Sequence, residues 1–283
     1  MPILNRKIDF AVVFSAKGAN PNGDPLNGNR PRTTLDGLGE LSDVCLKRKI
    51  RDRLQENGHA IFVQSDDNKT DEYGSLRERA EAVLKEAMTD RYELRRKACE
   101  TWIDVRAFGQ LFAYKGGGKK RDGVSEGIKG PVTIQSAFSV APVSVSSIQI
   151  TKSVSGEGDG TKRASDTMGM KHRVDHGLYV TYGSMNPSLA EKTGFSDEDA
   201  AAIKAVLPRL FENDASAARP EGSMEVLAVY WWEHDSKGGR YSSAKVHRSL
   251  RVEPKIDQPA AVDDYDIVLQ PLDGLEPEVL SGF

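Results

Sequence analysis

Hydrophobic and polar positions along the chain indicate both strands and helices. The apolar run Ile8–Phe14 predicts a buried strand. Ser42 is a good helix N-cap, and the apolar positions after it predict a helix over Ser42–Asn57 that Asn57-Gly58 ends. The core face of that helix is expected to carry Val44, Leu46, Ile50 and Leu54. Further strands are predicted at Ala60–Val63, Trp102–Phe108, once or twice within Pro131–Thr151, at Leu178–Tyr182 and at Met224–Trp231, and further helices at Ser75–Glu100 and from Ser196 onward. The fold class is therefore α+β.

A long irregular loop follows the first strand. Gly18–Arg32 reads GANPNGDPLNGNRPR, with three Gly, three Pro and four Asn, a composition that neither a helix nor a central strand tolerates. Gly18 and Gly23 have the spacing of a phosphate-binding loop. However, Asp24-Pro25 stands where that motif needs Lys and Ser or Thr, so the nucleotide-binding interpretation fails.

Two more segments have unusual composition. Residues 115–130 form a basic, glycine-rich loop in the prediction, and the stretch from Ser153 to Thr161 is rich in Ser and Gly. Connections this long are usually functional or disordered. A single domain over residues 1–283 is expected, with a helical insertion at about 64–101 and a hairpin at about 151–173.

Composition indicates a soluble protein. Charged residues make up 29% and hydrophobic residues 38% of the 283. The early apolar run Phe10–Phe14 is too short for a signal peptide or a membrane span, and the two distant cysteines predict reduced thiols. We therefore expect a cytoplasmic protein that makes no membrane contact.

The net charge of −3 hides an uneven distribution. The acidic C-terminal tail, residues 252–283, holds one Lys against eight Asp and Glu, a net −7; subtracting this from −3 leaves +4 for residues 1–251. Local fields steer a charged partner, so a mildly basic body remains compatible with nucleic-acid binding. The tail is interpreted as a shield for an outer face or a contact with a neighbour.

Cations gather near the first loop. Arg30 and Arg32 end it, and Lys47, Arg48 and Arg51 occupy the side of the first helix opposite its apolar stripe. Such a row suits a phosphodiester backbone, although a solvated helix face has the same appearance. In the hairpin at 151–173, apolar Met168 and Met170 among cations could wedge between bases.

Catalytic patterns are weak. His172 and His176 have a spacing that could bind zinc on a helix, but no third ligand lies nearby and the flanks look strand-like. No metal or cofactor is expected. Asp24 and Asp36 are the acids nearest the basic surface, and they could assist phosphodiester cleavage or only cap turns.

Four ordered motifs together resemble one family. They are NPNGDPLNGNRPR in the first loop, LSDVCLKRKIR at the first helix, WIDVRAFG at 102–109 and GPVTIQSAFSVAPV at 130–143. The chain resembles the repeated RAMP-superfamily backbone subunit of the type I-C CRISPR surveillance complex, Cascade. The resemblance implies an RRM-like (ferredoxin-like) palm, a helical fingers insertion and a β-hairpin thumb.

The resemblance also implies a function without catalysis. Such a subunit polymerises along a CRISPR RNA and presents it in segments for pairing with target DNA. Its partners are further copies of itself, a guide-processing endonuclease, and large and small Cascade subunits. Matching the family motifs residue by residue assigns RNA contacts to Asn22, Gly23, Arg30, Arg32, Lys47, Arg48, Arg51, Gln135 and Ser136, and the thumb adds Met168, Met170 and Lys171.

Two other functions stay open. RAMP relatives include RNases, and type III backbone subunits cut RNA with an aspartate of the corresponding first loop, where this chain has Asp24. A generic single-strand binding protein is the third interpretation, and it predicts binding without ordered filaments.

Overall fold

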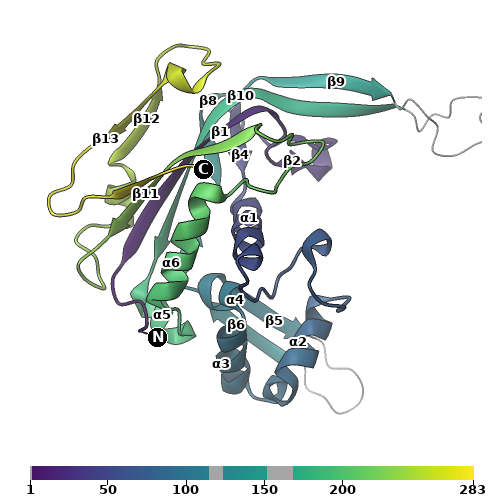
Figure 1. Ribbon diagram of the computed structural model, residues 1–283, viewed down its shortest axis with the longest axis vertical. Helices are drawn as coiled ribbons and strands as arrows, with labels where there is room; N and C mark the ends of the chain where they lie inside the picture. The colour runs from purple at the N-terminus through teal and green to yellow at the C-terminus, as the bar shows by residue number, and fades with distance from the viewer. Residues whose placement is uncertain (1, 115–123, 152–167) are drawn as a thin grey trace, which may run out of the picture.

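An antiparallel sheet forms the centre of the molecule (Figure 1). The computed structural model describes residues 2–114, 124–151 and 168–283. The sheet runs in the order β14-β11-β1-β10-β8-β4, and β7 and β9 also pair with β10. Its strands are β1 (Ile8–Ala19), β4 (Leu38–Leu41), β7 (Val132–Ile134), β8 (Ala137–Pro142), β9 (Val145–Thr151), β10 (Met168–Met185), β11 (Met224–Glu233) and β14 (Glu278–Ser281).

The first strand lies at the middle of this sheet. β1 pairs antiparallel with β10 on one side and with β11 on the other, and its side chains from Ile8 to Ala16 are buried. The predicted strand Ile8–Phe14 is therefore confirmed, and it continues to Ala19 because pairing with β10 extends as far as Ala19 and Val174. The predicted strands at Leu178–Tyr182 and Met224–Trp231 are confirmed within β10 and β11.

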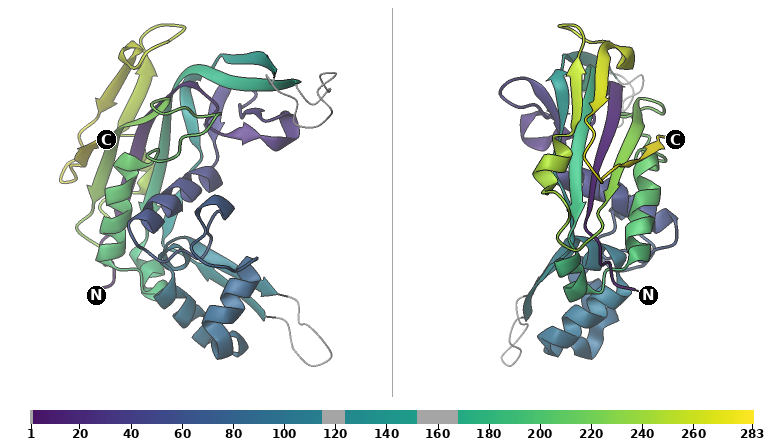
Figure 2. Two further views of the ribbon diagram at one scale, coloured as in Figure 1. Left: turned by 45° about the vertical axis from the view of Figure 1, so that its right-hand side comes forward. Right: turned by 90° about the vertical axis from the view of Figure 1, so that its left-hand side faces the viewer.

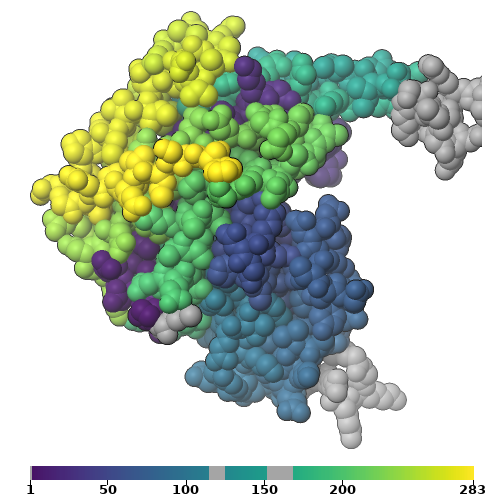
Figure 3. Space-filling view, in the orientation of Figure 1, coloured from purple at the N-terminus to yellow at the C-terminus, as the bar shows by residue number. Residues whose placement is uncertain are grey.

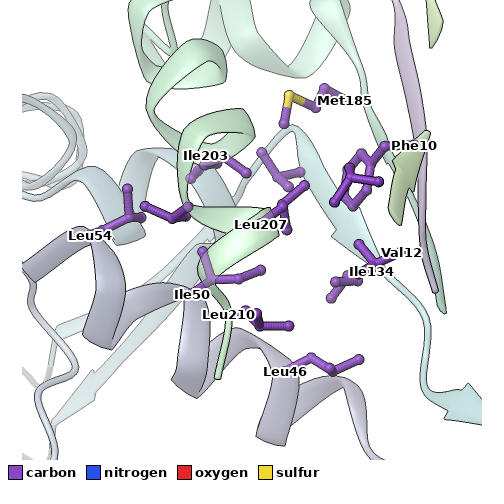
Figure 4. Packing of buried hydrophobic residues seen from close by; sticks show 14 of the residues in the cluster. Phe10, Val12, Leu46, Ile50, Leu54, Ile134, Met185, Ile203, Leu207 and Leu210 are labelled. Atoms are coloured by element: carbon purple, nitrogen blue, oxygen red, sulfur yellow. The ribbon is translucent and has the colours of Figure 1, made fainter. Parts of the chain in front are cut away.

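One face of the sheet is covered by helices. They are α1 (Asp43–Glu56), α5 (Pro187–Thr193) and α6 (Asp197–Val206), followed by the 3-10 turn η5 (Leu207–Arg209). Phe10 and Val12 of the sheet share a core with Ile50 of α1 and Ile203 of α6 (Figure 4). The predicted helix starts at Ser42 and Ser196 are confirmed, because the hydroxyls of both residues accept backbone N–H groups of the first turn. Val44, which the pattern assigned to the core, is exposed.

The opposite face is covered by C-terminal elements. α7 (Ser243–His247) and the hairpin of β12 (Leu250–Pro254) and β13 (Tyr265–Leu269) enclose a second core with the sheet, and η6 (Val262–Asp264) precedes β13. Figure 2 shows this hairpin lying across the sheet. The acidic tail is thus folded: its last strand, β14, pairs with β11 at the sheet edge.

A separate subdomain is inserted between α1 and β7. It contains α2 (Leu76–Leu84), α3 (Arg91–Thr101), α4 (Ile103–Phe108), the 3-10 turns η2 (Asp66–Asn68) and η3 (Lys85–Thr89), and the hairpin β5 (Gly109–Tyr114) and β6 (Val124–Lys129). Its own core gathers Phe62, Ala80, Leu84, Leu94, Ala98, Cys99, Trp102, Val105, Phe112 and Ile128. This insertion subdomain projects from the body beside α1 (Figure 1).

Several predictions in this insertion are wrong. The single helix Ser75–Glu100 is broken, because Lys85 adopts a positive φ and Asp90 caps the new helix α3. Trp102–Phe108 is a helix, and Ala60–Val63 is no strand. α4 buries Val105 in the insertion core and Ile103 and Ala107 in the main core, so its buried apolar residues fall at every second position, which is the period of a strand.

A two-stranded arm extends from the sheet (Figure 2). It consists of β9 and the first residues of β10, paired from Val145 with Val174 to Thr151 with Met168. The predicted hairpin at 151–173 therefore begins earlier, and its residues 152–167 lie outside those described. In the predicted loop 115–130, residues 124–129 form β6, and 115–123 lie outside the described ranges. Within those ranges, no helix combines the length and the apolar character needed to cross a membrane.

Candidate nucleic-acid interface

The loop after β1 is ordered by its own hydrogen bonds. β2 (Gly23–Asp24) and β3 (Arg30–Pro31) form a miniature hairpin around the 3-10 turn η1 (Pro25–Asn27). The carboxylate of Asp24 accepts the Leu26 N–H at 3.2 Å and caps this turn. A Cβ at Gly23 would overlap the Asn29 side chain, which would have to move, and Gly28 ends the turn with a φ of 58°, a conformation that favours glycine. Turn chemistry thus explains the composition of the loop and fixes the position of its arginines.

Arg30 joins the loop to the arm. Its Nη1 donates to Ser147 Oγ of β9 at 3.1 Å, and that hydroxyl lies 2.8 Å from His172 Nδ1 of β10. Among the described residues Arg30 forms no ion pair with a carboxylate, whereas Arg32 Nη2 lies 3.5 Å from Asp24 Oδ1. The Arg30 guanidinium therefore lies where loop and arm meet, with a hydroxyl and no carboxylate as its partner in the part of the chain that the structure describes.

The arm exposes apolar side chains on both faces. Cross-strand pairing places Met168 and Met170 on the same face as Ser147, and they are 63% and 56% exposed. Ile148 and Ile150 are exposed on the other face. Lys171 pairs with Ile148 and so lies on the isoleucine face. The structure thus brings Met168 and Met170 toward the Arg30 side and sets Lys171 apart from them.

The cations of α1 are largely occupied within the fold. Lys47 Nζ donates to Asp43 Oδ2 at 2.8 Å. Arg51 Nε donates to buried Asp104 at 2.9 Å and lies over the Phe108 ring. Arg48 pairs with Asp52 at 3.4 Å and donates to the Val63 carbonyl, and burial lowers the pKa of its guanidinium. Arg48 and Arg51 hold the insertion subdomain against α1, and their contact with phosphate stays a prediction.

The remaining predicted contacts are spread over the molecule. Asn22 Oδ1 accepts the Ser42 N–H at 3.0 Å and so anchors the loop to the start of α1. Gln135 and Ser136 lie between β7 and β8, where the Gln135 N–H donates to the carbonyl of Tyr182 on β10 at 2.8 Å. Tyr182 is roughly 30 Å along the strand from His172 at about 3.3 Å per residue. Gln135 and Ser136 therefore do not lie with Arg30 and the methionines.

The alternative chemistries have structural explanations in the same residues. Asp24 caps a turn and pairs with Arg32, so its carboxylate has two structural contacts. His172 and His176 lie on strand β10, where residues four apart are roughly 13 Å apart. Within the described ranges, three or more His, Cys, Asp or Glu side chains nowhere gather as they would around a metal ion.

Several neighbours of this surface were missed by the sequence prediction. Ser147 contacts Arg30 of the loop, and His172 contacts Ser147, only because the fold brings them together, since 117 residues separate Arg30 from Ser147. Exposed Lys17 lies opposite His176 in the β1–β10 ladder. Lys17 could have been identified as the first charged residue after the apolar run.

Figure 3 shows the molecule hollowed between the arm and the insertion subdomain, with the first loop beneath the arm. Arg30 and the exposed methionines belong to this side, and α1 runs between its two walls (Figure 1). An elongated polyanion is the kind of ligand that fits an uncompensated arginine beside exposed apolar groups. We call this concave surface, formed by residues 17–32, the arm and α1, the cradle.

Comparisons with known proteins give consistent matches. The family described as CRISPR-associated protein Cas7 matches residues 6–270. A CRISPR-associated protein Cas7 of Haloferax volcanii is 26% identical over 242 residues, which cover 81% of this chain and 71% of that protein. Two solved structures are similar to this chain, with TM-scores of 0.47 and 0.42 and sequence identities of 17% and 19%. Each comparison covers 80% of this chain, and it covers 75% of the first solved chain and 68% of the second. They are described as a CRISPR RNA-guided surveillance complex, pre-nicking, and a CRISPR RNA-guided surveillance complex. Since the family match spans nearly the whole chain, the protein belongs to the Cas7 family of CRISPR-associated proteins.

Proposed function

We propose that this chain is the CRISPR RNA-binding backbone subunit of a type I-C Cascade complex. Copies of it bind along the guide RNA and hold it in segments for pairing with target DNA, so that base pairing reads sequence and the protein contacts the backbone. Family membership over residues 6–270 supports the general function. The type I-C assignment is supported by the four motifs in the sequence.

The sheet order supports an RRM-like palm. β1, β8, β10 and β11 are the first to fourth strands of a β-α-β-β-α-β unit, with α1 and α6 as its helices, and they lie in the order fourth, first, third, second. The insertion subdomain corresponds to the fingers and the arm to the thumb. Because α7 and the β12–β13 hairpin cover the sheet face opposite α1 and α6, we assign the RNA to the cradle and not to an open sheet face.

The contact between Arg30 and Ser147 is the observation that carries the proposal. It joins the loop predicted to bind phosphate with the arm predicted to bear an apolar wedge, and within the described ranges no carboxylate pairs with Arg30. Arg32 pairs with Asp24 and Lys47 pairs with Asp43, and both acids are partly exposed to solvent. A phosphate could therefore compete with these acids for the two cations. Asn22, Gly23, Gln135 and Ser136 remain proposed backbone contacts along the path of the RNA, and Met168 or Met170 the proposed wedge.

We propose that the subunit is not an enzyme. Asp24 caps η1 and pairs with Arg32, which is a sufficient structural reason for its presence. Replacing it by asparagine should leave guide length and target binding unchanged, since an amide oxygen also caps a turn. Appearance of a cleavage product that the Asp24→Asn protein fails to make would establish the RNase alternative.

The proposed partners follow from this assembly: the guide RNA, further copies in a helical filament, a guide-processing endonuclease, and the large and small subunits. A cytoplasmic location is part of the proposal. No cofactor or metal is required for it.

Coexpression tests the function. The chain is produced with its companion subunits and a CRISPR array, purified by size exclusion, and the RNA that co-elutes is sequenced. One uniform repeat-spacer RNA in a large particle is expected. Arg30→Glu should reduce the RNA-bound fraction, whereas Arg6→Glu should not, because Arg6 pairs with Glu233 at the far end of β1. A monomer free of RNA in the unaltered preparation would disprove the proposal.

A further inference from the structure

A second loop lies against the start of the cradle loop. Residues 210–223 connect η5 with β11. The Asn20 N–H donates to the carbonyl of Ala218 at 2.8 Å, and the Lys17 N–H donates to the carbonyl of Ser223 at 2.8 Å. Figure 3 shows this green segment beside the purple first loop and above α1. The segment therefore borders the cradle, although sequence analysis assigned it no role.

A buried lysine organises the charges of this loop. Asp214 Oδ2 accepts from Arg219 Nε at 2.9 Å and also from Lys49 Nζ of α1. The Lys49 side chain is 5% exposed and that of Arg219 is 27% exposed. Lys49 thus compensates the Asp214 charge from inside. Arg219 is held by the same carboxylate and faces partly outward, so the three groups together carry one net positive charge.

The loop also encloses a small pocket with an unused hydroxyl. Asp214, Arg219 and Ser223 line it together with Phe211 and Met224. Ser223 Oγ is shielded from solvent and has no hydrogen-bond partner among the described residues. A shielded polar group without a partner costs free energy, so a rotation of the Ser223 side chain that lets its hydroxyl donate to a ligand atom in the pocket would be favoured.

Cations from three elements converge beside this pocket. Burial raises the pKa of the Cys45 thiol, and the charges of Lys49, Arg219 and Arg32 act against that rise. The same thiol lies 4.0 Å from the Pro21 carbonyl of the first loop. Arg219 of the second loop and Arg32 of the cradle loop thus both lie near Cys45, where the Asp214 carboxylate acts on the thiol in the opposite direction.

We propose that Arg219 and Ser223 bind one phosphate of the guide RNA backbone, with Asp214 and Lys49 as positioning residues. This inference rests on the proposed RNA-binding function and adds a wall to the cradle. Arg219 supplies the charge-assisted donor and Ser223 the hydroxyl donor, a pair that suits a phosphodiester oxygen. Exposed Glu221 lies on the same loop and opposes the anion.

Salt-dependent binding of a repeat-spacer RNA oligonucleotide to the purified protein tests the site. Each phosphate contact with a single strand contributes about 0.7 to the slope of log K against log salt. Arg219→Gln should lower the slope by about 0.7, Arg219→Lys should retain it, and Glu221→Gln should strengthen binding. Arg209→Gln is the matched control, because exposed Arg209 lies over the Phe283 ring.

The outcomes separate the two proposals. If the unaltered protein shows no salt-dependent RNA binding, the proposed function itself fails. If it binds but Arg219→Gln and Glu221→Gln leave slope and affinity unchanged, the second-loop site is overturned while the function stands. Glu221→Gln keeps the test decisive if Arg219→Gln does not fold, since Glu221 forms no ion pair among the described residues.

Discussion

The cations of α1 and those of the first loop look alike in sequence but differ in their surroundings. Arg48 and Arg51 of the helix are half-buried and bound to Asp52 and Asp104. Among the residues that the structure describes, Arg30 of the loop donates to a hydroxyl and forms no ion pair, and neither does exposed Lys17. The difference teaches that the cations of a basic helix face can form ion pairs that hold two parts of the same protein together. Availability for a ligand depends on burial and partners more than on charge count.

The largest loss of stability should follow from removing the ion pair between Arg51 and Asp104. Asp104 is buried and accepts the N–H groups of Phe62 and Val63 as well as Arg51 Nε. Asp104→Ala should lower the free energy of unfolding by about 3–5 kcal/mol, because it leaves Arg51 buried without its partner. Urea unfolding measures this. Asp43→Ala, which removes an exposed partner of Lys47, should cost at most about 1 kcal/mol. Equal costs would erase the distinction between the two kinds of cation.

The two faces of the arm offer a sharper comparison on the ligand side. Replacing Met168 and Met170 by serine should weaken RNA binding by about tenfold, because their apolar surface is no longer buried against bases. Serine at Ile148 and Ile150 removes similar apolar surface from the opposite face and should leave affinity for a single RNA strand unchanged. Fluorescence anisotropy with both double variants distinguishes the faces. Equal losses would show that the wedge assignment is wrong.

Acid should destabilise the base of the arm. Burial lowers the pKa of His176, and Lys17 lowers it further. The folded protein then binds fewer protons than the unfolded chain, so stability is complete above the unfolded value of about 6.5 and falls as the pH decreases below it. The slope contributed by this group cannot exceed about 1.4 kcal/mol per pH unit. The urea midpoint should depend less on pH in the His176→Gln variant than in the unaltered protein. An equal pH dependence would show that groups other than His176 cause the loss of stability in acid.

The smallest expected effect concerns Lys47, the α1 cation whose ion pair with Asp43 is partly exposed to solvent. Lys47 pairs only with Asp43 one turn away, and both side chains are partly exposed. Lys47→Gln should lower the salt slope of RNA binding by about 0.7 without changing the midpoint of unfolding. Arg48→Gln is the contrasting variant, since it should mainly lower stability. If Lys47→Gln alters stability and not the slope, α1 contributes no phosphate contact.

Local signals explain which elements could be predicted. The helix at Ser42 is predictable from its N-cap, and the strand at Ile8 is predictable from its apolar run. Each of these signals is contained within a few consecutive residues. α4 was missed because two cores bury its opposite sides, which removes the helical period from its sequence. At the site, Arg30 and Arg32 followed from loop composition. The Ser147 contact and the Asp214–Arg219 loop could not follow, because only the fold brings those segments together.

The position of β14 has a consequence for shortened versions of the protein. Its four residues cover the outer edge of β11, whose sequence MEVLAVYWWE is strongly apolar. A chain cut before Glu278 would present that edge with unpaired N–H and C=O groups, a template for pairing with other chains. Such a truncation should precipitate during expression even where the RNA cradle is intact. We therefore expect the last strand of the acidic tail to protect the sheet edge from pairing with other chains.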